Sequence, residues 1–208
     1  MIKIKERIKK SLKDNKGFSL TELIIVIAII LLMTAASFVT LSIVHGARAK
    51  DAASSFENSL AEVISLSKNN GVDKNDNGVI DGEEDKYTIG LKIYKIGQKY
   101  YLQKCICKKS ATGVYTDAGF TSSDAYIKSI NESSGKGICL SAYVDIKFYD
   151  LDGNDASADS YIIAFNKKGE CVLGYGKYEF KKSNTGNTIV TVSVNKNGGY
   201  ISSKYQGR

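Results

Sequence analysis

One carboxylate stands at the start of a long apolar run near the N-terminus. Glu22 is followed by the apolar run Leu23–Met33, and mostly apolar residues continue to Val44. A lone ionisable group at membrane depth is costly, so it marks a functional site that needs a partner. Glu22 is therefore a candidate functional residue, and the chemistry it offers is an ion pair or a strong hydrogen bond.

A second group of chemistry-bearing residues lies in the polar stretch 71–86. Its spacing is that of an EF-hand loop, with Gly78 at the sharp turn and Ile80 as the apolar anchor. The predicted metal ligands are Asp73, Asn75, Asn77, the backbone carbonyl of Val79, Asp81 and Glu84. Calcium takes about six to eight hard oxygen ligands, and Asn in place of Asp favours weak, extracellular-type affinity. A solvated acidic turn is the alternative, but agreement at every defining position favours calcium.

The chain has four cysteines, Cys105, Cys107, Cys139 and Cys171, all beyond the apolar run. An even count in an extracytoplasmic domain permits two disulfides, in any of about three connectivities. Cys105 and Cys107 face the same side of a strand, so we expect them to reach other partners rather than each other. Reduced, partly buried thiols are the alternative. Zinc is disfavoured because no His or acidic cluster accompanies the pair.

Other polar groups carry weaker signals. The acidic stretch 150–155 has Gly153 in the wrong place for an EF-hand, so a solvated turn is favoured over a second cation site. His45 is the only histidine and is expected to be an interfacial helix residue. The C-terminal basic residues that could hold DNA phosphates are Lys181, Lys182, Lys196, Lys204 and Arg208. Surface lysines of a Lys-rich chain explain them better.

No catalytic constellation appears in the sequence. The serines lack a Gly-x-Ser-x-Gly elbow, and no phosphate-binding loop is present. We therefore expect a protein that is not an enzyme.

The elements that position these residues begin with a basic leader. Residues 1–17 carry seven Lys or Arg against Glu6 and Asp14, which is +5 of the net charge of +7. Positive charge before an apolar run holds the N-terminus in the cytoplasm. The run that follows, 18–44, exceeds the roughly 20 residues that span a bilayer. The rest of the chain is then expected outside, and the high overall charge is no argument for nucleic acid.

The helical pattern continues beyond the apolar run. Apolar residues recur at steps of three and four and make one stripe: Ala49, Ala52, Ala53, Phe56, Leu60, Val63 and Ile64. Asn69–Gly71 is a plausible stop, so one helix of about 75–80 Å is predicted from Phe18 to Asn69. An ordinary secretory signal with cleavage near Ala35–Ser37 is the chief alternative. Glu22 and the unbroken helical pattern argue against it.

Beyond Lys86 the apolar period changes to two, which predicts strands. Tyr87–Ile96 and Lys99–Cys107 read as a hairpin around Gly97, with a short strand near Val114 and a helical turn at Ser123–Ile130. Further strands are predicted at Ile138–Tyr149, Tyr161–Asn166, Cys171–Gly174, Tyr178–Lys182, Thr188–Asn195 and Tyr200–Ser203. Strands that follow a helix rather than alternate with it predict an α+β fold with an antiparallel sheet.

The order of Gly17, Phe18, Glu22 and the apolar run, over Lys16–Ala36, resembles the class III leader of type IV pilins and pseudopilins. The resemblance implies a prepilin peptidase that cuts between Gly17 and Phe18, N-methylation of Phe18, and a Glu22 that pairs with the amine of a neighbouring subunit. It also implies a long helix whose second half packs on a β-sheet. Many major pilins carry a helix-kinking proline, which this chain lacks.

The resemblance gives each segment a role. Residues 1–17 are the leader, 18–44 the transmembrane and filament-core helix, 45–70 its amphipathic half, 71–86 the calcium loop, and 87–208 a β-rich head. The implied partners are the peptidase, other pilin subunits, the inner-membrane assembly platform and membrane lipid. The implied location is first the cytoplasmic membrane, in a single pass, and then an extracellular filament.

The closing strands, with the turn Phe165–Gly169, resemble the C-terminal part of the FimT/GspH family of minor pilins and pseudopilins. Together with the missing proline this favours a minor subunit. A pseudopilin of a type II secretion or competence system is one alternative. A membrane-anchored calcium-binding surface adhesin that does not assemble is another.

Overall fold

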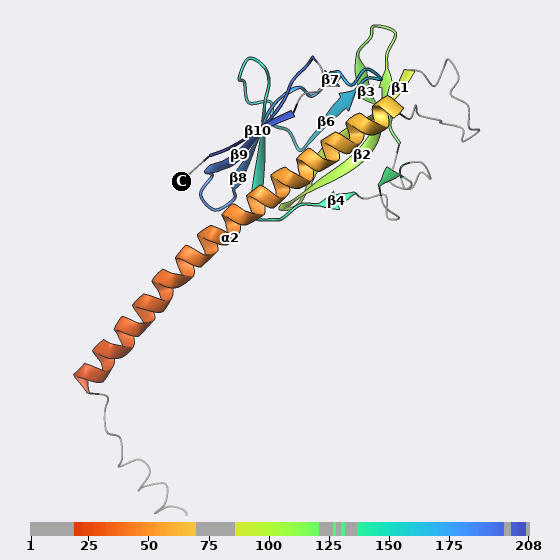
Figure 1. Ribbon diagram of the computed structural model, residues 1–208. Coiled ribbons are helices and arrows are strands. Elements are labelled where there is room, and N and C mark those ends of the chain that lie inside the picture. The colour runs from red at the N-terminus through yellow and green to blue at the C-terminus, as the bar shows by residue number, and fades with distance from the viewer. Residues whose placement is uncertain are drawn as a thin grey trace, which may run out of the picture. The chain divides into compact units, whose positions relative to one another are not determined.

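The structure is a computed structural model of the 208-residue chain, and it describes residues 19–69, 86–120, 127, 130–131, 137–197 and 201–206 (Figure 1). The chain divides into two compact units, Met1–Ile43 and Val44–Arg208. Each unit is described separately below.

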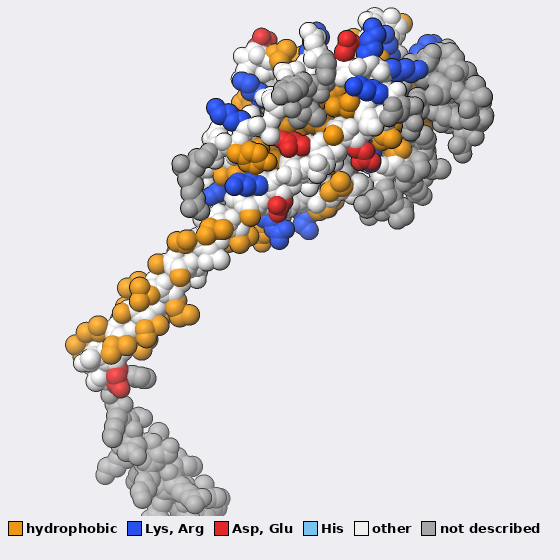
Figure 2. Space-filling model, viewed as in Figure 1, with side chains coloured by type: hydrophobic (Ala, Val, Ile, Leu, Met, Phe, Trp, Pro, Cys, Tyr) orange, Lys and Arg blue, Asp and Glu red, His pale blue; other side chains and the backbone are white. Residues whose placement is uncertain are grey.

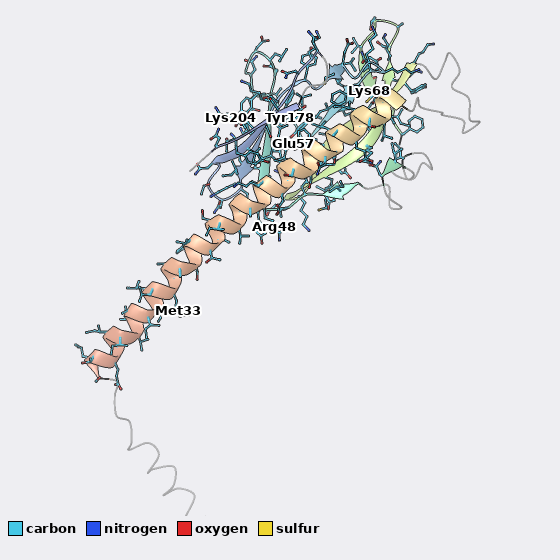
Figure 3. All side chains as sticks on the ribbon, in the orientation of Figure 1. Met33, Arg48, Glu57, Lys68, Tyr178 and Lys204 are labelled. Atoms are coloured by element: carbon cyan, nitrogen blue, oxygen red, sulfur yellow. The ribbon has the colours of Figure 1, made fainter. Side chains whose placement is uncertain are left out.

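A single continuous helix, α2 (Leu20–Asn69), runs through the described part of the first unit and into the second. The predicted helix is confirmed apart from its first residues, and it passes Val39 without a break. Figure 3 marks Met33 on the apolar half, and Arg48, Glu57 and Lys68 on the half that belongs to the second unit. The absence of proline explains the continuity, since proline is the commonest cause of a sharp kink.

The second unit contains two antiparallel sheets within its described residues. One has the strand order β3-β2-β1-β6-β7, with β4 also paired to β2, and the other has the order β10-β9-β8-β5. The strands of the first sheet are β1 (Tyr87–Ile96), β2 (Lys99–Lys109), β3 (Tyr115–Asp117), β4 (Ile138–Cys139), β6 (Ser160–Phe165) and β7 (Cys171–Leu173). The strands of the second are β5 (Val144–Tyr149), β8 (Gly176–Lys182), β9 (Thr188–Val194) and β10 (Ile201–Tyr205). The predicted α+β fold is confirmed.

The core of this unit lies between α2 and both sheets. The predicted stripe is buried from Ala49 to Val63, with Ile64 packed at its margin. Phe56 reaches the second sheet, with its ring 5.1 Å from Tyr178 and 5.5 Å from Phe180 between centroids. The alanines before Phe56 and the Phe56 ring are all buried in this core, which is close-packed as protein interiors are.

One predicted strand differs from the structure, and one predicted helical turn is only partly described. The single strand predicted at Ile138–Tyr149 is wrong, because the chain leaves the first sheet after β4 and joins the second at β5. Leu140, between them, turns into the core. The helical turn predicted at Ser123–Ile130 lies mostly outside the described residues, although Ile127 and Ile130 are helical and Ile127 is buried.

Candidate functional site

The carboxylate of Glu22 closes a reciprocal pair of hydrogen bonds at the start of α2. The Ser19 backbone N–H donates to Glu22 Oε2 over 2.8 Å, and the Glu22 N–H donates to Ser19 Oγ over 3.1 Å. The first helical bond follows, from Leu23 N–H to the Ser19 carbonyl at 3.1 Å. Ser19 is thus the N-cap and Glu22 the third helical residue, which is the arrangement called a capping box. Both side chains are exposed.

Behind this box the helix presents apolar side chains all round. Leu20, Leu32 and Met33 are each more than two-thirds exposed, and orange hydrophobic atoms cover this stretch in Figure 2. Among the described residues, α2 is the one helix long and apolar enough to cross a membrane. A helix that is apolar on every side is stable only where lipid or other protein covers it.

Three hydroxyl side chains in the apolar half form hydrogen bonds within the helix. Thr34, Ser37 and Thr40 donate to the carbonyls four residues earlier, over 2.7, 2.8 and 3.0 Å. Such bonds leave no unsatisfied donor in an apolar environment. Glu22 alone keeps a charge there, so it is the group in this segment that can recognise another charge.

Two predicted site groups lie outside the described residues. Gly17 and Phe18 precede the first described residue, Ser19, and the predicted calcium ligands Asp73, Asn75, Asn77, Val79, Asp81 and Glu84 lie within 70–85. The flanks of that loop are described. Ser67 Oγ donates to the Ile89 carbonyl over 3.1 Å, which ties the end of α2 to β1. The two described flanks, at Ser67 and Ile89, are therefore neighbours in the fold.

The cysteines are free thiols, and three of them are buried. Cys105 and Cys107 share one face of β2 and a small apolar cluster with Ala164. Cys171 lies in the main core with Phe165, on the opposite face of the sheet. Cys139 is exposed opposite Tyr101. The expectation that Cys105 and Cys107 reach the other two cysteines is therefore not met, and the reduced alternative agrees with this geometry.

Glycine makes room for the strand pair. Gly90 lies opposite Cys105 in the register, and a Cβ there would sit 2.9 Å from Cys107 Sγ. A hydrogen bond with Cys107, and then burial, raise the pKa of the Cys105 thiol. Reactive cysteines have lowered pKa values, so the raised pKa and burial of Cys105 point to a structural role.

The remaining polar candidates also have structural partners. In the acidic stretch, Asp150 accepts from the Asn154 N–H over 2.8 Å, and Asp155 pairs with Lys147 at 2.9 Å. Hydrogen bonds from the Asn154 side chain and then its backbone lower the pKa of the Asp150 carboxyl, and hydrogen bonds from Ser157 and then Lys147 lower the pKa of the Asp155 carboxyl. No group of three or more His, Cys, Asp or Glu is placed to hold a metal within the part of the chain that the structure describes. The solvated turn is the better interpretation there.

The sole histidine is more buried than expected. His45 lies 4.7 Å from Tyr143 between ring centroids, and its Nδ1 is 3.4 Å from Ser183 Oγ. The predicted helical position is confirmed, its side chain packs inside the second unit, and its place at a membrane interface stays a prediction.

Two of the C-terminal lysines have separate partners within the fold. Lys181 pairs with Glu179 at 2.9 Å, and Lys196 stands over the Tyr175 ring at 5.3 Å. Arg208 lies outside the described residues. These contacts give DNA binding no support.

Ser19 was not predicted as the N-cap of the helix. The signal was present, because Ser-x-x-Glu before an apolar run is the sequence signature of a capping box. The helix was instead predicted to begin at Phe18, with Glu22 read only for its charge.

A long helix with an exposed apolar half and one charge at its start, followed by antiparallel sheets, is consistent with the α+β fold of type IV pilins. The family model described as the prokaryotic N-terminal methylation motif matches residues 12–38. This match supports a type IV prepilin or pseudopilin. No curated protein and no solved structure matched it, and the FimT/GspH-like character of the C-terminal part stays a prediction.

Proposed function

We propose that this chain is a structural subunit, in a minor role, of a type IV pilus or a related pilus-like filament. A prepilin peptidase cuts between Gly17 and Phe18, and the new amino group of Phe18 is methylated. The observation that carries the proposal is Glu22 at the start of the exposed apolar half of α2, within the matched methylation motif.

Assembly follows from the exposed surface of that helix. Before assembly, lipid covers residues 20–44, and in the filament neighbouring helices replace the lipid. Moving an unpaired carboxylate into that bundle would cost several kcal/mol. A bond from Glu22 to the terminal amine of a neighbouring Phe18 removes that cost for both charges, and it selects the axial position of each new subunit.

The test compares Glu22→Ala with Thr21→Ala, which alters the same exposed helical turn and leaves the carboxylate in place. We expect both variants to lose the leader, because the cleavage residues are intact. Only Glu22→Ala should be missing from sheared filaments. Normal incorporation of Glu22→Ala would contradict the assigned contact.

The polar stretch 73–84 is proposed to bind one calcium ion. The support is the agreement of its sequence with the EF-hand loop, together with the Ser67–Ile89 bond that holds the two flanks together. A loop of alternating Asx residues between fixed ends loses less entropy when it closes around an ion. Calcium would then stiffen the connection between helix and sheet outside the cell.

A minor position in the filament is supported by two features of the sequence. The apolar half lacks the proline found in many major pilins, and the closing strands resemble those of minor subunits. Quantifying this subunit against the total protein of sheared filaments tests the point. A small fraction is expected, and a dominant one would make it the major subunit.

A further inference from the structure

In the capping box, Ser19 holds the Glu22 side chain in place. An ion pair between Glu22 and a neighbouring subunit would not by itself require this. Ser19 contributes both of its hydrogen-bonding groups, the N–H to Glu22 Oε2 and the hydroxyl oxygen to the Glu22 N–H. The carboxylate is therefore held toward the N-terminal end of α2. That is the end at which cleavage would create a new amino group.

The box uses one carboxylate oxygen. Within the described residues, Oε2 accepts the bond from the Ser19 N–H, and Oε1 accepts none. A carboxylate has about four lone-pair sites. Oε1 can therefore accept a hydrogen bond from another molecule while Oε2 keeps its bond to Ser19. The helix dipole also favours a negative charge at this end. The charge is thus partly satisfied before a neighbour arrives.

We propose that Ser19 is a positioning residue for assembly, which holds Glu22 with one oxygen engaged and the other presented to the terminal amine of a neighbouring subunit. This inference rests on the proposed filament function. The bond between Phe18 and Ser19 survives cleavage, so the same box is present in the processed subunit. The box also fixes the first helical residue at Leu20, downstream of the predicted cleavage bond.

Two substitutions separate the box from the charge. Ser19→Ala removes the hydroxyl that accepts from Glu22 and keeps the carboxylate, whereas Ser19→Thr keeps an N-capping hydroxyl. Glu22→Gln keeps an oxygen that can close the box and removes the charge, because Gln serves at this position as well as Glu. Thr21→Ala is the control for the turn.

The experiment uses the full chain, processed by a prepilin peptidase in its membrane. Three quantities are measured: the cleaved fraction, the share of cleaved subunit in sheared filaments, and amide exchange at Glu22 in detergent micelles. Loss of an N-cap shifts the helix-end equilibrium about fivefold. Ser19→Ala should therefore lower both amide protection and filament incorporation about fivefold at an unchanged cleaved fraction. Ser19→Thr should restore both.

Glu22→Gln should keep the amide protection and lose incorporation. Ser19→Ala that incorporates like wild type, or Ser19→Thr that fails like Ser19→Ala, would overturn the role of Ser19 and leave the filament function intact. A Glu22→Gln subunit that incorporates normally would instead overturn the proposed ion pair, and with it the contact that Ser19 positions.

Discussion

Phe56 is the aromatic side chain by which α2 packs against the second sheet. It is fully buried, and its ring contacts Tyr178 and Phe180. Figure 3 labels Tyr178 beside the helix near Glu57. Core aromatic side chains of this kind contribute more than their area alone, because the rings also interact with one another.

Replacing Phe56 by Ala should destabilise the second unit by about 3–5 kcal/mol, because it removes a large buried ring and leaves a cavity. Urea unfolding of a soluble fragment covering Val44–Arg208 measures the change. Leu151→Ala is the control, since Leu151 is 63% exposed and surface changes stay within roughly 0.5 kcal/mol. Equal effects of the two variants would mean that Phe56 does not anchor the helix.

The cysteines should differ in reactivity by position. Cys139 is exposed, whereas Cys105, Cys107 and Cys171 are buried. Iodoacetamide added to the folded protein should label Cys139 first, and Cys139→Ser should abolish the fast reaction. Fast labelling of Cys105 or Cys107 would show that the β2 pair is open to solvent.

Burial of Cys171 also makes stability depend on alkaline pH. Burial raises the pKa of this thiol from 9.0 to about 12. The folded state then keeps a proton that the unfolded chain releases, so the stabilisation is complete below about pH 9 and is lost as pH rises toward 12. Unfolding measured from pH 8 to 11 should show a slope that Cys171→Ala reduces by up to about 1.4 kcal/mol per pH unit. An unchanged slope would contradict this burial.

At the scale of elements, the periodicity of apolar residues predicted the features that depend on neighbouring residues in the chain. The stripe from Ala49 to Val63 fixed the buried face of the helix, and the period of two around Gly97 predicted the first hairpin. The division of the strands into two sheets was not predictable, because it depends on the turn of the chain at Leu140. The burial of His45 was missed for a similar reason, since Tyr143 and Ser183 are distant in sequence.

The candidate site was predicted in part. Glu22 stands out by type and place, but its bond to Ser19 depends on where the helix begins. The opposite faces of Cys107 and Cys171 depend on a sheet whose strand order the sequence leaves open.

Gly174, in the turn after β7, is required both for its positive φ and for the lack of space beside it, whereas Gly186 is required for its positive φ alone. Gly174 has φ +74°, and a Cβ there would lie 2.4 Å from the Ile162 carbonyl oxygen. Gly186 has φ +69° with open space around it. Gly186→Ala should cost about 1–2 kcal/mol from backbone strain alone, and Gly174→Ala roughly 1–3 kcal/mol more from the clash. Equal losses in thermal unfolding would contradict the close approach of the two strands.

The proposed calcium loop should stabilise the second unit by mass action. At calcium tenfold above Kd the gain is about 1.4 kcal/mol, or roughly 3–6 °C in Tm for a unit of this size. A chelator should remove that gain from the Val44–Arg208 fragment. Glu84→Gln should lower Tm in calcium and make it insensitive to chelator. An unchanged Tm on chelation of the parent fragment would exclude the site.

For the whole molecule, removal of the leader changes both length and charge. The leader carries +5 of the total +7, so a processed subunit is close to neutral. In the proposed topology, the charge that would retain the N-terminus in the cytoplasm before processing is then absent from the filament. A nearly neutral subunit also lets apolar contacts, rather than charge repulsion, govern the packing of neighbouring helices.

The most direct test of the account is the N-terminal residue of the subunit recovered from sheared filaments, read by sequencing and intact mass. The account predicts N-methylated Phe18. An intact leader beginning at Met1, or a new N-terminus near Ala35–Ser37, would contradict it.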